Sequence, residues 1–134
     1  IVVYGAASSR QTQAVTASAI SLSAPGVSPL KAIERLPGVN FQSADPFGAY
    51  EWSTRITIRG FNQTQLGYTL DGLPLGDMSY GNYNGLHISR AIISENIDRV
   101  ELAQGAASLS TASTSNLGGA LTFTTPRSTA DPTA

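Results

Sequence analysis

The sequence predicts an α+β domain with a small mixed β-sheet, short helices and long loops. Three observations lead to this prediction. The chain has 134 residues, enough for one domain with a buried core. Short runs that alternate apolar and polar residues, the pattern of half-buried β-strands, recur along it. Helical patterns are few and short, and breaks that contain Gly or Pro separate the segments, so strands and short helices are mixed along the chain.

The N-terminal part gives one clear helix signal. Residues 15–23 fit either a strand or a short helix. Ser28 then suits a helix N-cap, with Pro29 at the first helical position. Pro37 and Gly38 end this helix. Its expected buried face holds Leu30, Ile33 and Leu36.

Five further runs have the alternation or β-branched content of strands. In chain order they are residues 39–42, 54–59, 67–70, 97–104 and 121–125. The dipeptide Asp71-Gly72 follows the third run and predicts a hairpin turn, because both residues tolerate positive φ. Residues 43–53 and 73–86 have no period, so we expect two long loops there. Residues 89–96 are expected to hold one or two helical turns.

The two ends of the chain differ from its middle. Residues 5–12 are small and polar and offer almost no apolar surface, so the expected organisation begins with a mobile segment over residues 1–14. Residues 15–127 form the folded domain, and residues 128–134 are a polar tail that we interpret as a linker. No run approaches the roughly 18 apolar residues of a membrane-spanning helix.

Composition argues against several function classes. The formal net charge is −1 and the pI about 5.7, so no basic surface points to nucleic acid. Cysteine is absent and His87 is the only histidine, so neither a disulfide framework nor a metal site with two histidines is expected. Asp71 and Asp77 could pair as carboxylates, but Asp71 already has a turn role. We therefore expect no enzyme, no metal and no cofactor.

Four motifs in order resemble the plug domain of TonB-dependent outer-membrane receptors. They are Leu36-Pro37-Gly38-Val39, Ile56-Thr57-Ile58-Arg59-Gly60-Phe61, Tyr68-Thr69-Leu70-Asp71-Gly72-Leu73-Pro74, and the segment from Ile97 to Pro126 with its Gly118-Gly119 pair. The resemblance covers residues 1 to about 126. Charged residues are 13% of the chain, against roughly 25% in soluble domains. That low share is typical of a surface that faces another protein wall.

The resemblance implies a location and a set of partners. The plug would lie in the lumen of its own C-terminal β-barrel, in the outer membrane of a Gram-negative bacterium, and residues 128–134 would lead to that barrel. It would close the lumen and contribute to binding a small-molecule nutrient at its apex. Its periplasmic N-terminus would couple to the TonB protein by adding a β-strand to a TonB sheet. The candidate coupling residues, which resemble the end of a TonB box, are Ile1, Val2, Val3 and Tyr4.

Barrel contacts are expected at three positions in or next to strands. In the family, the arginine of an Ile-Arg-Gly motif faces the barrel wall and pairs with its carboxylates, and Arg59 matches that position. Arg99 is a second arginine within an alternating strand. Where the family has an Arg-Gly-Pro motif, this chain reads Gln104-Gly105-Ala106. Gln104 is therefore an uncharged third candidate, and half of the usual charge cluster is missing.

Aromatic residues are the candidate ligand-facing groups, because Tyr and Trp combine an apolar face with a polar atom. These candidates are Tyr50, Trp52, Tyr68, Tyr80 and Tyr83. Cations are scarce near them, so a sugar or an aromatic ligand fits better than a strongly anionic iron chelate.

Two other interpretations remain open from the sequence. One is a free-standing periplasmic or extracellular ligand-binding domain without a barrel, which a native product ending near Ala134 would favour. The other is an enzyme domain, which would require loss of activity on mutation of Asp71 or His87. A long C-terminal extension of alternating strands would favour the receptor instead.

Overall fold

The computed structural model describes residues 11–76, 85–113 and 115–128. Within these ranges the strands form two sheets. The larger sheet consists, in spatial order, of β1 (Thr12–Thr16), β7 (Arg99–Ala103), β8 (Ala120–Thr124), β5 (Gly67–Leu70) and β6 (Leu73–Pro74). β5 and β8 are parallel and the other neighbours are antiparallel. The predicted mixed sheet is therefore confirmed.

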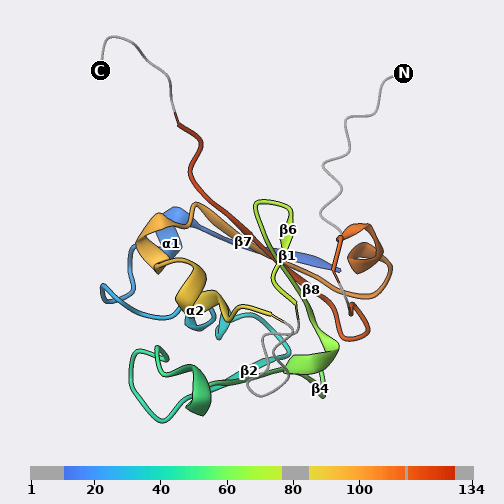
Figure 1. The fold of residues 1–134 in the computed structure, drawn as a ribbon, viewed down its shortest axis with the longest axis horizontal. Helices are drawn as coiled ribbons and strands as arrows, with labels where there is room; N and C mark the ends of the chain where they lie inside the picture. The colour runs from blue at the N-terminus through green and yellow to red at the C-terminus, as the bar shows by residue number, and fades with distance from the viewer. Residues whose placement is uncertain (1–10, 77–84, 114, 129–134) are drawn as a thin grey trace.

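A second, smaller sheet was not predicted. It consists of β2 (Val39–Gln42), β3 (Arg55–Ile58) and β4 (Phe61–Asn62), all antiparallel. Arg59 and Gly60 both have positive φ, 49° and 86°, and they turn the chain back in a two-residue hairpin between β3 and β4. In Figure 1 the larger sheet crosses the centre of the molecule, and β2 and β4 lie below it.

The helices are short. In the described part of the chain they are α1 (Ala17–Ile20), α2 (Ile88–Ala91) and five 3₁₀ helices: η1 (Lys31–Ile33), η2 (Glu51–Ser53), η3 (Gln63–Gln65), η4 (Ser94–Asn96) and η5 (Gly105–Ser110). α1 and α2 lie at the left in Figure 1. Together the sheets and short helices make the predicted α+β class.

The helix predicted after Ser28 is shorter than expected. Its amide groups bond three residues back rather than four, as when Lys31 donates to the Ser28 carbonyl at 2.9 Å, so only η1 is helical. The Ser28 hydroxyl does accept a bond from the Leu30 amide at 3.3 Å. Leu30 and Ile33 are fully buried, so the predicted apolar face is confirmed.

The N-terminal boundary also differs from the prediction. β1 begins at Thr12 and pairs with β7 along its whole length, from Thr12 opposite Ala103 to Thr16 opposite Arg99. The end of the predicted mobile segment 1–14 therefore lies in the sheet. The strand forms because β7 provides its backbone hydrogen-bond partners. The local sequence has few apolar residues and therefore did not indicate a strand.

The core lies on the inner faces of both sheets. Along β7, Val100 and Leu102 are buried opposite Phe123 and Leu121 of β8, whereas Arg99 points to solvent. This alternation is what the sequence predicted. Each fully buried apolar side chain contributes about 1.5–3 kcal/mol, so these strand faces contribute substantially to the stability of the fold. The hairpin turn is also confirmed: Asp71 and Gly72 have φ of 49° and 83° between β5 and β6.

Candidate functional site

The loop of residues 43–53 carries an exposed aromatic pair. The Tyr50 and Trp52 side chains are 53% and 54% exposed, and their ring centroids lie 5.6 Å apart. Figure 1 shows this loop at the end of the molecule opposite to the one where the chain leaves β8 towards residue 128. We call it the loop end. Two neighbouring rings that are each about half exposed can receive a planar or apolar ligand group.

Asp45 organises the backbone of this loop. The Ser43 hydroxyl donates to its Oδ1 at 2.7 Å, and the amides of Ala49 and Tyr50 donate to its two carboxylate oxygens at 3.0 and 3.3 Å. These bonds favour the charged form and lower the pKa of Asp45 to about 2. The carboxylate therefore stays ionised and holds the strand-to-η2 connection in one conformation.

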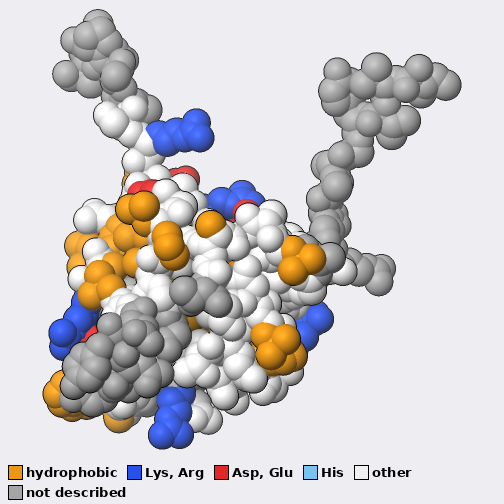
Figure 2. Space-filling view, turned by 45° about the vertical axis from the view of Figure 1, so that its right-hand side comes forward, with side chains coloured by type: hydrophobic (Ala, Val, Ile, Leu, Met, Phe, Trp, Pro, Cys, Tyr) orange, Lys and Arg blue, Asp and Glu red, His pale blue; other side chains and the backbone are white. Residues whose placement is uncertain are grey.

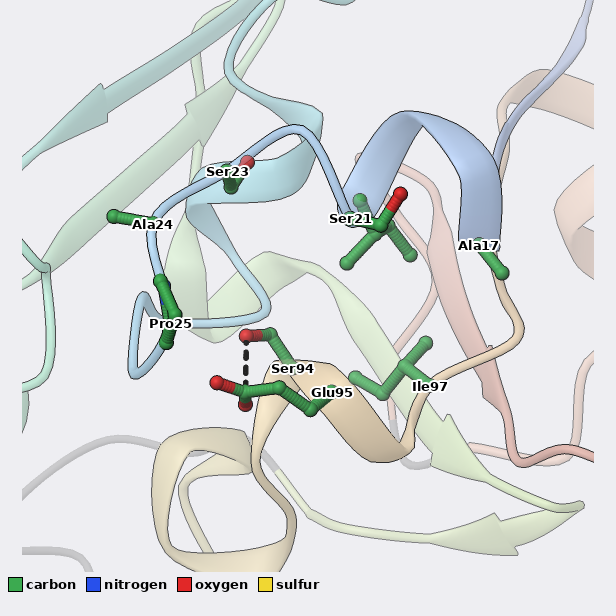
Figure 3. Close-up of a pocket in the computed structure, with 9 residues that line it drawn as sticks. Ala17, Ser21, Ser23, Ala24, Pro25, Ser94, Glu95 and Ile97 are labelled. Carbon is green, nitrogen blue, oxygen red and sulfur yellow. Dashed lines mark hydrogen bonds between the residues drawn. The ribbon is translucent and has the colours of Figure 1, made fainter.

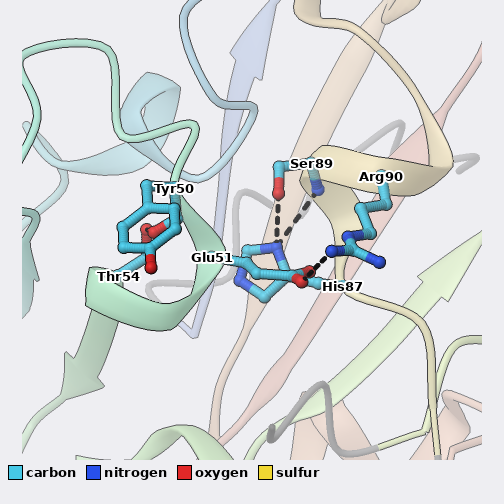
Figure 4. Close-up of polar contacts among 6 residues, drawn as sticks. All are labelled: Tyr50, Glu51, Thr54, His87, Ser89 and Arg90. Atoms are coloured by element: carbon cyan, nitrogen blue, oxygen red, sulfur yellow. Dashed lines mark hydrogen bonds and ion pairs between the residues drawn. The ribbon is translucent and has the colours of Figure 1, made fainter.

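An ion pair joins the loop to α2. Arg90 Nη2 lies 2.6 Å from Glu51 Oε1, and the Glu51 side chain is 14% exposed. His87, the N-cap of α2, lies beside this pair, as Figure 4 shows. Its Nδ1 accepts from the Ser89 amide at 3.3 Å and lies 2.7 Å from the Ser89 hydroxyl. Burial lowers the pKa of His87, which Glu51 opposes and Arg90 reinforces.

Tyr68 does not belong to the ligand-facing set. It lies in β5, its side chain is fully buried, and its hydroxyl donates to the Gln63 carbonyl at 3.1 Å. The ring is part of the core because β5 is an interior strand between β8 and β6. Tyr80 and Tyr83, like the candidate coupling residues Ile1, Val2, Val3 and Tyr4, lie outside the described residues.

Arg59 occupies the first position of the β3–β4 turn. Its amide donates to the Gly38 carbonyl at 2.8 Å, and its side-chain methylenes lie over Gly38. The residue is exposed, and it forms no ion pair with any residue that the structure describes. A charged group held outward on a hairpin tip is available to a partner outside this chain segment.

Arg99 and Gln104 have partners or surroundings that differ from those expected. Arg99 pairs with Glu101 of the same strand at 2.9 Å and is about half exposed. Gln104 continues the inward alternation of Val100 and Leu102 and is only 5% exposed. The structure therefore removes Gln104 from the outward-facing set. Among the described residues, neither atom of its amide has a hydrogen-bond partner.

Two hollows border α1, and neither is lined by Tyr50 or Trp52. One, of about 290 Å³, lies between α1 and η4, and Glu95 and Ser94 line it (Figure 3). Glu95 accepts bonds there from the Gly26 amide at 2.7 Å and from the Ser94 hydroxyl at 3.3 Å. The other, of about 470 Å³, is lined largely by apolar side chains that include Leu22 and Phe47.

Charged side chains are sparse on the surface. On the face drawn in Figure 2, acidic side chains are few, Lys and Arg are dispersed, and apolar side chains gather towards one side. Within the described ranges, no group of three or more His, Cys, Asp or Glu side chains could hold a metal ion. No helix in the described part is long and apolar enough to cross a membrane.

The family model of the TonB-dependent receptor plug domain matches residues 5–120. The chain belongs to this family. Most of the chain is covered by the match, including all of its described strands except β8, of which only Ala120 is matched. Curated protein sequences gave no significant match.

Solved receptors share the fold of this plug domain. A mutant of the ferric enterobactin receptor PfeA from Pseudomonas aeruginosa, in complex with enterobactin, matches with a TM-score of 0.66 and 21% identity over 87% of this chain and 18% of the receptor. The siderophore receptor PirA from Pseudomonas aeruginosa gives 0.60 and 23%, over 89% and 19%. The ferric yersiniabactin uptake receptor FyuA from Yersinia pestis gives 0.58 and 20%, over 87% and 17%. The plug domain thus spans less than about a fifth of the length of these receptors.

Sequence reasoning missed two features of the plug domain's loop end. The first is the role of Asp45, for which the turn-forming residues Pro46 and Gly48 next to it were an available signal. The second is the Glu51–Arg90 ion pair. It joins two segments far apart in the chain, and nothing in either local sequence indicates that they meet.

Proposed function

We propose that this plug domain closes the lumen of a TonB-dependent outer-membrane transporter, contributes to ligand binding at its loop end and couples to TonB through residues 1–4. The single observation that carries the proposal is the plug-family match over residues 5–120. The exposed Tyr50–Trp52 pair supports a ligand-binding role for the loop end. We expect a small molecule with a planar or apolar face, because Arg90, a cation close to the pair, is already neutralised by Glu51.

Arg59 supports the proposal that this domain contacts a surrounding protein wall. It is charged, exposed and unpaired within the described residues. Arg59→Ala should change the unfolding free energy of this chain by about 0.5 kcal/mol or less, as at other surface sites. In the full-length receptor the same change should weaken plug retention or transport. A large destabilisation of the chain alone would show that Arg59 has a structural role within the domain instead.

Uptake and binding by the full-length receptor test the proposal. Trp52→Ala should weaken ligand binding by about three- to tenfold, the range for one lost aromatic contact. Leu109→Ala, at an exposed apolar residue of η5, is the matched control and should have no effect. Val3→Pro should abolish uptake but leave binding unchanged, because proline removes the amide donor of an added strand, whereas Val3→Ala keeps that donor. Normal uptake by Val3→Pro would contradict coupling through residues 1–4.

A further inference from the structure

His87 is buried and has only one of its two ring nitrogens engaged. The residue is 5% exposed. Nδ1 accepts the hydrogen bond of the Ser89 amide, which caps α2. A backbone amide can only donate, so Nδ1 carries the lone pair and the proton of the neutral ring is on Nε2. Nε2 is itself buried and finds no hydrogen-bond partner in the part of the chain that the structure describes.

The ring lies beside two oppositely charged groups on two different elements (Figure 4). Among the described residues, the charged groups that act on it are Glu51 of η2 and Arg90 of α2. These two form the ion pair that holds η2 against α2, and the Glu51 side chain is largely buried in it. Figure 4 shows the imidazole next to the bridge, with Tyr50 on the η2 side. Glu51 is also the residue between Tyr50 and Trp52, so this ion pair ties the backbone that carries the aromatic pair to α2.

We propose that His87 is a pH-sensitive latch that controls the position of the Tyr50–Trp52 pair. When His87 is neutral, it caps α2, and Glu51 forms its ion pair with Arg90. Protonation of Nδ1 removes the acceptor of the Ser89 amide and places a positive charge beside Glu51. The imidazolium then competes with Arg90 for the carboxylate, which releases η2 from α2. The contacts that carry this latch lie within the chain, so it stands or fails independently of the proposed transport role.

The electrostatic environment gives the direction of the switch. Burial is the main influence on the pKa of His87 and lowers it below the ordinary 6.5. The fold therefore favours the neutral ring, and the unfolded chain binds the proton more readily. Stability is unaffected by this group above about pH 6.5 and decreases as the pH falls from there towards the folded-state pKa. The latch opens under acidic conditions.

The chain contains one histidine and one tryptophan. The protonation of His87 and the surroundings of Trp52 can therefore each be followed by a separate spectroscopic signal. We would titrate the 134-residue chain from pH 8 to pH 5, recording the imidazole NMR resonances of His87 and the fluorescence emission of Trp52. Ordinary carboxylates titrate below this range. We expect a His87 midpoint below 6.5 and an emission change with the same midpoint. An emission that stays constant while His87 titrates would overturn the proposal.

Three variants distinguish a latch role of His87 from a purely structural role. His87→Asn keeps an oxygen acceptor for the cap but cannot ionise, so its Trp52 emission should be flat between pH 8 and pH 5. Glu51→Gln and Arg90→Gln both break the same ion pair. They should nevertheless move the His87 midpoint in opposite directions, down for Glu51→Gln and up for Arg90→Gln, because Glu51 favours the imidazolium and Arg90 opposes it. Shifts of the same sign, or an unchanged emission titration in His87→Asn, would refute the latch.

Discussion

The carboxylate of Asp71 accepts two hydrogen bonds from Thr125, one from its amide at 2.9 Å and one from its hydroxyl at 2.7 Å. Asp71 is a residue of the β5–β6 turn, and Thr125 is the first residue after β8. The Asp71 amide also donates to the Phe123 carbonyl at 2.9 Å. The hairpin turn is thereby tied to the point where the chain leaves the sheet.

Replacing Asp71 by Asn tests the strength of this tie. Asn tolerates the positive φ of 49° and keeps one acceptor oxygen, so the turn should form but lose one charge-assisted bond. We expect a loss of about 0.5–1.5 kcal/mol in unfolding free energy by urea denaturation. Asp98→Asn, at an exposed position before β7, is the control and should stay within about 0.5 kcal/mol of the wild type. Equal effects of the two changes would show that only net charge matters.

Acid should destabilise the domain through two aspartates. Hydrogen bonds lower the pKa of Asp45 to about 2 and that of Asp71 in the same direction. Both groups bind protons more readily in the unfolded chain, so their stabilisation is complete above their ordinary pKa and is lost as the pH falls towards the folded-state values. Urea midpoints should therefore drop between about pH 4 and pH 2. The double variant Asp45→Asn, Asp71→Asn should show a flatter profile, and an unchanged slope would contradict this assignment.

Hydrogen exchange should be slowest at the centre of the larger sheet. β7 and β8 have hydrogen-bonded neighbours on both edges, whereas β1 has one. Amides of Val100–Leu102 and Leu121–Phe123 should exchange at least about tenfold more slowly than those of Gln13–Val15. Mass spectrometry or NMR on the 134-residue chain would measure this. Uniformly fast exchange would show that the chain does not fold without further partners.

Replacing Gly48, in the loop of residues 43–53, should strongly destabilise the domain. A Cβ there would lie 2.6 Å from Phe41 Cζ, and φ is +65°. Gly26 has a similar φ of +81° but nothing within 4 Å, so Gly26→Ala measures the backbone strain alone. We expect Gly26→Ala to cost about 1 kcal/mol and Gly48→Ala about 1–3 kcal/mol more, from overpacking against Phe41. Equal losses by thermal or urea unfolding would mean that Phe41 moves aside freely.

Local signals were sufficient for features that depend on a few adjacent residues. The Asp71-Gly72 turn and the buried face with Leu30 and Ile33 follow from backbone freedom and apolar spacing, and both were predicted. The mixed sheet followed from the alternation along β7 and β8.

Features that depend on long-range contacts were not predictable in the same way. Tyr68 and Gln104 have polar atoms and were expected at the surface, yet Tyr68 in β5 and Gln104 directly after β7 are both buried. The Glu51–Arg90 pair and the pairing of β1 with β7 arise only once the chain has folded. Side-chain type did not indicate on which side of a strand a residue would lie.

The order of strands also determines when this domain can form. β7 and β8 are the interior strands that join β1 to β5, but both come from the last third of the chain. A polypeptide that emerges N-terminus first, from a ribosome or a translocation pore, presents β1 and β5 before their central partners exist. Until then only the β5–β6 hairpin and the β2–β3–β4 sheet can pair, because the remaining contacts are distant in sequence. The larger sheet can therefore be completed only when β8, the last of its strands along the chain, arrives.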